Sequence, residues 1–337
     1  MYSYNLIQWL FIFYFYCFAG WCIESAYVSL MSRKLVNRGF MRGPFLPLYG
    51  SGATMMLLVS SPFQDHLVLV FLAGCVGATV LEYVTGVTME ALFKIRYWDY
   101  SNQPFNFQGH VCLGTSLAWG ALTILMTRFV HKPVEMLVLA IPMQPLGIIT
   151  MLLTIYIVGD FALSFKAAMD LKNILIKMEK AKEEMLRIQK RLDELITATG
   201  EGLSSKKTAF TQSVGQQKDV IVQKLHIDEL KASIEDKLES LKEKIRRKPA
   251  EYSDEAKDEI MELHTQYRVS KEKRDIFSSL RNYAQRDMIR SNPTMNSRKY
   301  REAFEELRQK TRRKGGELAA QENKEEKREK EENKAEQ

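Results

Sequence analysis

Four carboxylates lie inside long apolar stretches in the first half of the sequence, where an ionised side chain is costly. They are Glu24, Glu82, Glu90 and Asp160. An acid within a membrane-spanning helix must be paired, hydrated or bound to a cation, so it marks a candidate functional site. The chemistry that these residues predict is the binding of a cationic solute or a cationic headgroup.

The composition of the chain changes near residue 165. Residues 1–165 carry 8 Lys+Arg and 7 Asp+Glu, whereas residues 166–337 carry the other 40 and 34. A soluble domain mixes apolar and charged residues along its length, so this division excludes a single soluble globule. The four cysteines lie in or beside apolar stretches, which excludes a secreted disulfide scaffold. We expect an all-α protein, with a polytopic membrane helix bundle over residues 1–165 and a cytoplasmic coiled-coil and helical tail.

Five segments are long and apolar enough to cross the ~30 Å core of a bilayer, which needs ~20 helical residues. They cover about residues 6–30, 43–61, 67–93, 111–130 and 138–165. Backbone groups in lipid must bond internally, so we expect these segments to be helices. The second is the weakest, because Pro44 and Pro47 crowd its start together with two glycines. We expect its start to line an internal face or to re-enter the membrane.

Basic residues in the short loops indicate the orientation of the bundle. The first loop holds four of them, including Arg38 and Arg42, and no acid, and the long tail is rich in Lys and Arg. Cytoplasmic loops carry such an excess. We therefore expect a multi-pass protein of the cell membrane, with the N-terminus outside and the tail in the cytoplasm, although Arg128 and Lys132 in the fourth loop run against the rule. All four acids then fall in the cytoplasmic half.

Two of the acids have simpler interpretations. Glu90 could pair at the interface with Lys94, four residues on, and Glu24 could be solvated at the end of its helix. The arrangement also shows a faint parallel repeat, because segments one and three each carry an acid and each lead into an aromatic and basic loop and a Gly/Pro-containing start of the next segment. Transporters often contain such repeats.

Ordered polar and aromatic motifs run through the membrane half. They are GWCIE (20–24), NRGFMRGPFLPLYG (37–50), LEYVTG (81–86), Glu90, YWDYS (97–101), PFN (104–106), GHVCL (109–113) and WG (119–120). With these motifs, about residues 8–160 resemble the CmpB-like family of type IV ABC-transporter permeases, and the tail is not covered. The resemblance implies a transporter permease. It adds Arg38, Trp98, Asp99 and Asn106 to the acids as polar positions of the site.

Several kinds of chemistry are missing from the sequence. No G-x-x-x-x-G-K-[ST] motif occurs, so an ATPase that drives transport would be a separate subunit. No Cys or His pair has metal-ligand spacing and no hydrolase signature occurs, so we expect no metal, no cofactor and no enzymatic activity. An enzyme acting on lipid headgroups could still use the acids with His110, although nothing in the sequence demands it. The alternative to transport is a membrane-anchored, oligomeric scaffold whose tail makes the interactions.

The tail divides by its apolar pattern. Apolar residues at 171, 174, 178, 181, 185, 188, 192 and 195 alternate steps of three and four, which predicts a coiled coil over 166–196 and a homo-oligomer formed from Leu171 to Leu195. Glycines indicate a linker over 197–217. Residues 218–314 are expected to be helical, as a hairpin or paired with another subunit. Residues 315–337 predict a disordered tail or a fraying single helix.

The tail also carries a basic segment. Residues 281–314 hold 11 Lys+Arg and 4 Asp+Glu. A basic segment tethered below a membrane can bind anionic lipid headgroups, and it can equally be a solvated helix. Nucleic acid is not an expected partner, because the segment contains no nucleic-acid-binding motif.

Overall fold

The computed structural model describes residues 3–200, 226–279 and 283–312. The chain forms two compact units. The first consists of Met1–Lys172, Asn282–Lys299 and Thr311–Gln337, and the second of Asn173–Arg281 and Tyr300–Lys310. Most of the predicted linker (197–217) and the whole predicted charged tail (315–337) lie outside the described residues.

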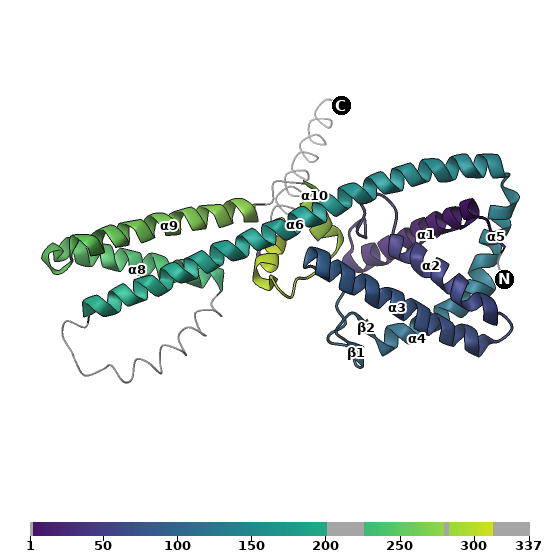
Figure 1. The fold of residues 1–337 in the computed structure, drawn as a ribbon, viewed down its shortest axis with the longest axis horizontal. Helices are drawn as coiled ribbons and strands as arrows, with labels where there is room; N and C mark the ends of the chain where they lie inside the picture. Colours follow the sequence, from purple (N-terminus) through teal and green to yellow (C-terminus); the bar gives the residue numbers. More distant parts are fainter. Residues whose placement is uncertain (1–2, 201–225, 280–282, 313–337) are drawn as a thin grey trace, which may run out of the picture. The chain divides into compact units, whose positions relative to one another are not determined.

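The first unit is a helical bundle (Figure 1). Its elements are α1 (Leu6–Ser32), α2 (Pro47–Ser60), η1 (Ser61–Phe63), α3 (Leu67–Phe93), β1 (Asn106–Phe107), β2 (Val111–Cys112), α4 (Leu113–Leu125), the π-helical turn η2 (Met126–Val130), α5 (His131–Ala140), the first part of α6 (Met143–Gly200) and α10 (Tyr283–Ser291). The two strands form an antiparallel hairpin in which Asn106 pairs with Cys112. Near the N-terminus, Asn5 and Gln8 form a capping box that starts α1.

Among the described residues, four helical stretches are long and apolar enough to cross a membrane: Leu6–Ser32, Leu67–Phe93, Leu113–Ala140 and Met143–Thr197. Large apolar side chains such as Ile148, Leu152 and Ile155 are exposed on the surface of the unit. An exposed apolar surface of this extent suits lipid as the solvent. The prediction of a polytopic membrane helix bundle is therefore confirmed, although the described residues contain four such stretches where the sequence predicted five.

Two of the predicted boundaries differ from the structure. The fourth predicted span ends near residue 130, but η2 joins α4 to α5 and the helical stretch continues to Ala140. The fifth predicted span starts near residue 138, but α6 starts at Met143. The reason is Pro142, because the residue before it, Ile141, is extended (ψ 124°) and the helix cannot run through this pair.

The second predicted span is helical only in its second part. α2 has 14 residues, or about 21 Å of helix, and starts at Pro47. The preceding residues 34–46, which we call the re-entrant segment, contain no regular helix. They fold back along α1, since the Arg38 amide donates to Ser25 Oγ (3.1 Å) and the Leu46 amide to the Cys17 carbonyl (2.9 Å). Non-helical backbone at this depth is tolerated where protein covers it.

The pairs α1/α2 and α3/α4 share a construction. α1 and α3 have 27 residues each, and each ends on a left-handed cap residue, Arg33 (φ 52°) and Lys94 (φ 58°). A non-helical segment then returns along the long helix before the next helix begins. Glycines allow the close approach within each pair: a Cβ at Gly50 would lie 2.3 Å from Cys17 Sγ, and one at Gly120 would lie 2.4 Å from Cys75 Sγ. This structural parallel agrees with the repeat that the sequence suggested.

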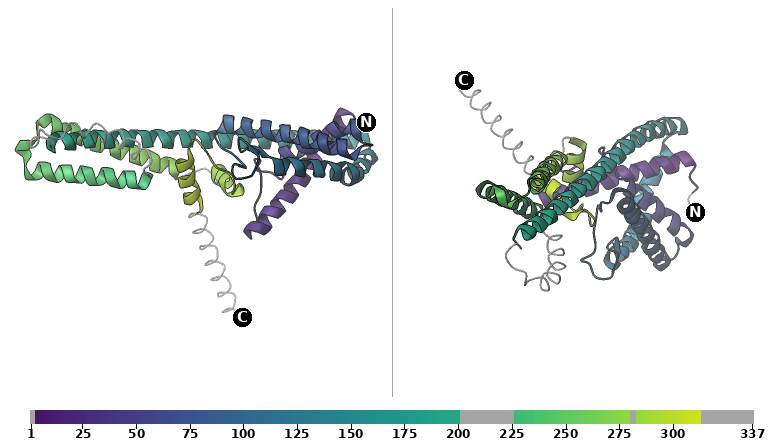
Figure 2. Two further views of the ribbon diagram at one scale, coloured as in Figure 1. Left: turned by 90° about the horizontal axis from the view of Figure 1, so that it is seen from below. Right: turned by 60° about the vertical axis from the view of Figure 1, so that its left-hand side comes forward.

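The second unit is a bundle of its own. The rest of α6 lies beside α8 (Ile227–Arg247) and α9 (Asp254–Ser278), as Figures 1 and 2 show, and the short η4 (Pro249–Glu251) joins α8 to α9. Residues 301–310 of this unit are also helical. The core contains Met185, Ile188 and Leu192 of the predicted heptad repeat together with apolar residues of α8 and α9. The repeat is thus buried within one chain, and the coiled coil and the homo-oligomer stay predictions.

Candidate functional site

The first acidic group is centred on Glu24 of α1. Its carboxylate accepts a hydrogen bond from the Tyr49 hydroxyl of α2 (2.6 Å) and pairs with the Nε of Arg38 (3.3 Å), which belongs to the re-entrant segment. The side chains of Arg38 and Glu24 are 13% and 25% exposed. Because the re-entrant segment folds back along α1, an arginine that follows the helix in sequence reaches a carboxylate within it. Glu24 therefore has a cationic partner inside the bundle.

The second acidic group is centred on Glu82 of α3, which is 6% exposed. Its two oxygens accept hydrogen bonds from the Tyr100 hydroxyl (3.0 Å) and from Trp119 Nε1 (2.9 Å). Both donors are neutral. Within the part of the chain that the structure describes, Glu82 forms no ion pair, which distinguishes it from Glu24 and Glu90. A buried carboxylate with only neutral donors still lacks a counter-charge.

The Glu24 and Glu82 groups lie within electrostatic reach of each other. Tyr49 interacts with the charges of both Glu24 and Glu82, and Tyr100 interacts with Glu82 and with Tyr49. The two tyrosines come from different halves of the α1–α4 arrangement, α2 and the loop after α3. We therefore treat the two groups as one candidate site, which we call the paired-acid site: Glu24, Arg38, Tyr49, Glu82, Tyr100 and Trp119.

Glu90 belongs to a separate network around Arg96. The Arg96 guanidinium is buried and pairs with Glu90 Oε2 (2.6 Å) and Asp99 Oδ1 (3.4 Å). Its NH1 also donates to the Gln108 carbonyl (3.0 Å), and its NH2 lies 3.3 Å from His110 Nε2. The ion-pair partner of Glu90 is thus Arg96, not Lys94. This network fixes the loop between α3 and α4 against the end of α3.

Two titratable groups of this loop respond to the network. Burial and the nearby Arg96 charge hold the pKa of His110 below its usual value. The carboxylate of Glu90, whose Oε2 lies 3.1 Å from His110 Nε2, acts in the opposite direction but does not outweigh them. Burial alone raises the pKa of Asp99, but hydrogen bonds from Ser101 and Asn296 and the charge of Arg298 outweigh it and hold that pKa below its usual value. The network therefore favours an ionised Asp99 beside a neutral imidazole.

The remaining predicted site residues have positioning contacts. Asp160 of α6 accepts the Gly43 amide (2.8 Å) and so holds the re-entrant segment. Trp98 Nε1 donates to the His110 carbonyl (2.9 Å). Asn106 accepts the Gly109 amide (3.1 Å) and donates to the Gln103 carbonyl (2.8 Å), which closes the hairpin turn. None of these contacts reaches Glu24 or Glu82.

Three residues of the paired-acid site were not predicted from the sequence as site residues: Tyr49, Tyr100 and Trp119. Tyr100 fits an interfacial aromatic belt by its position, yet its hydroxyl donates to Glu82. The available signal is that all three residues lie in the ordered motif runs of the membrane half. No group of three or more His, Cys, Asp or Glu suited to a metal ion occurs among the described residues.

Comparison with known proteins bears on the first unit. No curated protein and no solved structure matches the chain. The match is to a family model, and it covers most of the predicted spans while leaving the tail uncovered. Residues 11–165 match the model of the family described as "Putative ABC-transporter type IV", which confirms the family resemblance that the motifs of this region indicated.

Proposed function

We propose that the first unit is the membrane component of a transporter and that it binds a cationic solute or headgroup at the paired-acid site, from the cytoplasmic side. The observation that carries the proposal is Glu82, a buried carboxylate that accepts hydrogen bonds from two neutral donors and has no cationic partner among the residues that the structure describes. A bound cation would supply the missing counter-charge. The family match and the apolar helices support transport as the context.

The geometry supports a binding role divided between two halves of the unit. Glu24 already has Arg38 as its partner, so a ligand cation would interact mainly with Glu82, while Tyr49 and Tyr100 offer hydroxyl oxygens as further ligands. Because Glu82 is 6% exposed, a solute reaches it only after the surrounding loops move. Such a site would be occluded in the conformation described here and open in another one.

The proposal is tested by ligand-induced stabilisation of the full chain in detergent or nanodiscs. The probes are alkali cations, choline, ethanolamine and spermidine, each added over a concentration series. A cation bound at about 100 times its Kd stabilises the folded state by about 2.7 kcal/mol. We expect one probe class to raise the Tm of the wild type and to have no such effect on Glu82→Gln.

Asp65→Asn is the matched control, because it removes an exposed acid from the loop before α3. It should keep the full response to the cation. Equal responses of the wild type and Glu82→Gln to every stabilising probe would contradict the proposal, because the carboxylate charge would then contribute nothing to binding.

The energy source is expected to be a separate ATPase subunit. The support is the family match together with the missing P-loop motif. Purification of the tagged chain from native membranes should retain an ATPase. The expected orientation, with the N-terminus outside, is tested in the same membranes by labelling cysteines placed at the N-terminus and in the tail.

A membrane-anchored scaffold is the second candidate. The observation that favours it is a row of exposed apolar side chains on α9, Met261, Val269 and Ile276. Their spacing of eight and seven residues places them within about 80° around the helix. A second copy of the chain is the proposed partner. Disulfide cross-linking of Met261→Cys and Ile276→Cys should then give dimers, whereas Glu243→Cys on α8 should not, and monomers throughout would reject it.

A further inference from the structure

Residues 291–298, which we call the strap, follow α10 and lie against the re-entrant segment of the first unit. Arg38 Nη1 donates to Asn292 Oδ1 (3.0 Å), and Arg38 Nη2 donates to Thr294 Oγ1 (3.1 Å). In return, Asn292 Nδ2 donates to the Gly39 carbonyl (2.9 Å). The arginine that pairs with Glu24 is therefore also bound by two side chains more than 250 residues away in sequence.

The same strap binds the loop after α3. Asn296 and Arg96 form an antiparallel bridge, with the Arg96 amide donating to the Asn296 carbonyl (2.8 Å) and the Asn296 amide to the Arg96 carbonyl (2.9 Å). Thr294 Oγ1 donates to the Tyr97 carbonyl (2.8 Å), and Ser297 Oγ to the Lys94 carbonyl (2.6 Å). Main-chain pairing combined with side-chain contacts is the way in which proteins recognise extended peptides.

Part of the strap is buried as well as hydrogen-bonded. Asn292, Met295 and Ser297 are 2%, 1% and 2% exposed. Buried polar side chains are usually hydrogen-bonded, and the Asn292 side chain finds its partners at Arg38 and Gly39. The strap is thus a specific ligand of the two loops and not a segment that merely lies over them.

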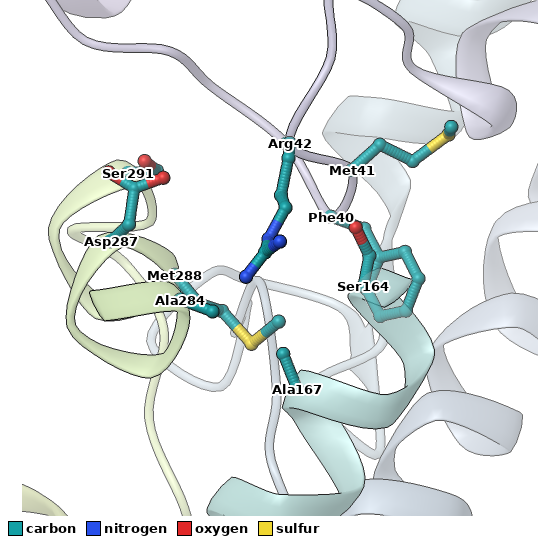
Figure 3. Close-up of a pocket in the computed structure, with 10 residues that line it drawn as sticks. Phe40, Met41, Arg42, Ser164, Ala167, Ala284, Asp287, Met288 and Ser291 are labelled. Carbon is teal, nitrogen blue, oxygen red and sulfur yellow. The ribbon is translucent and has the colours of Figure 1, made fainter. Parts of the chain in front are cut away.

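The approach to the strap is equally close-packed. Figure 3 shows Arg42 reaching from the re-entrant segment into the space between α10 and α6, towards Asp287 and Met288 on one side and Ser164 on the other. The cavity left there has a volume of about 10 Å³, room for about one water molecule. Tyr97 also directs its hydroxyl to Met288 Sδ (3.5 Å). α10 and the strap therefore close this side of the unit.

We propose that the re-entrant segment and the loop after α3 form a peptide-binding surface whose ligand is the chain's own strap, and that the strap covers the paired-acid site until it is released. The strap contacts Arg38, which pairs with Glu24, and Arg96, which pairs with Glu90. The strap also joins the α1/α2 pair to the α3/α4 pair, because it binds both the re-entrant segment and the loop after α3. The covering role rests on the proposed function, whereas the docking itself does not.

The docking is tested by hydrogen–deuterium exchange of the full chain in nanodiscs. In the wild type, we expect the amides of Met295 and Asn296 to be protected, because both donate hydrogen bonds. The double variant Asn292→Ala, Thr294→Ala loses the hydrogen bonds to Arg38. In this variant, the amides of Met295 and Asn296 should exchange at least about tenfold faster than in the wild type. Arg301→Ala, an exposed change just beyond the strap, should exchange like the wild type. Equally fast exchange in the wild type and the double variant would overturn the proposal.

The covering role is tested on the same proteins with native cysteines as reporters. Cys112 is 6% exposed and interacts with Tyr100, whereas Cys22 is exposed and serves as the reference. The probe is 2-aminoethyl methanethiosulfonate, a small cationic thiol reagent, and modification is read for each cysteine by mass spectrometry.

We expect Cys112 to react about tenfold faster in the double variant while Cys22 reacts at an unchanged rate. Unchanged labelling of Cys112 in a variant whose strap exchanges freely would overturn the covering role. Neither measurement requires transport, so both can succeed or fail independently of the Glu82→Gln experiment.

Discussion

Arg96 offers the sharpest test of how the loop after α3 is held. Its side chain is 4% exposed, and those of its partners Glu90 and Asp99 are 27% and 21% exposed. Removing one member of a buried ion pair costs about 3–5 kcal/mol, since the other member stays buried without a counter-charge. Because both carboxylates keep some contact with solvent, Arg96→Gln should cost about 3 kcal/mol, near the lower end of that range.

For a unit of this size, 3 kcal/mol corresponds to a fall in Tm of about 6–12 °C. The assay is thermal unfolding of the full chain in nanodiscs, followed by tryptophan fluorescence. Arg96→Lys keeps the charge but not the fork of donors, so it should fall between the wild type and Arg96→Gln. Arg301→Gln, whose pair with Glu305 is on the surface, should shift Tm by no more than about 2 °C. A Tm of Arg96→Gln within about 2 °C of the wild-type Tm would refute the reasoning.

Three further predictions use the same preparation. Gly50→Val should destabilise the α1/α2 contact by about 2–3 kcal/mol in thermal unfolding, because its Cβ would meet Cys17 Sγ, whereas Gly52→Val, with open space around its Cβ, should resemble the wild type. The pKa of His110 is lowered in the folded state, so its contribution to stability is complete above about pH 6.5, and it is lost as the pH falls through the folded-state pKa. Hydrogen–deuterium exchange of the loop after α3, corrected for its intrinsic pH dependence, should therefore become faster between pH 7 and pH 5. His110→Gln should remove this change. In the second unit, Arg274→Ala should cost about 3 kcal/mol, because it removes the fully buried cationic partner of Glu306, which keeps only its pair with the more exposed Lys310 (3.1 Å). A loss below about 1 kcal/mol in protease-monitored unfolding would disagree.

The helices of the first unit could be predicted where local pattern decides them. The bounds of α3, Leu67–Phe93, coincide with the predicted span because a continuous apolar run is flanked by loop residues on both sides. The stretch from α4 to α5 could not be predicted in this way. Arg128 and Lys132 resemble loop residues, yet they lie in a continuing helical stretch, where the Arg128 guanidinium donates to the Gln64 carbonyl.

The site could be predicted only in part for a related reason. Acids in apolar segments stand out because their burial is costly, so Glu24 and Glu82 were found from the sequence. Their partners depend on where the chain folds back, which periodicity does not encode. Trp119 lies 37 residues from Glu82, and the strap residue Asn292 lies 254 residues from Arg38. The strap is a short polar segment without a motif, and the sequence pattern predicts only that it belongs to a basic helical region.

The re-entrant segment has a further physical consequence. A stretch of α-helix resists local change because each residue shares in a ladder of bonds from one turn to the next, and unwinding it breaks several bonds at once. Residues 34–46 have no such ladder. Their path is fixed by a few separate contacts, among them Ser25 to Arg38 and Asp160 to Gly43. The re-entrant segment can therefore change course one contact at a time while α1 and α2 keep their length.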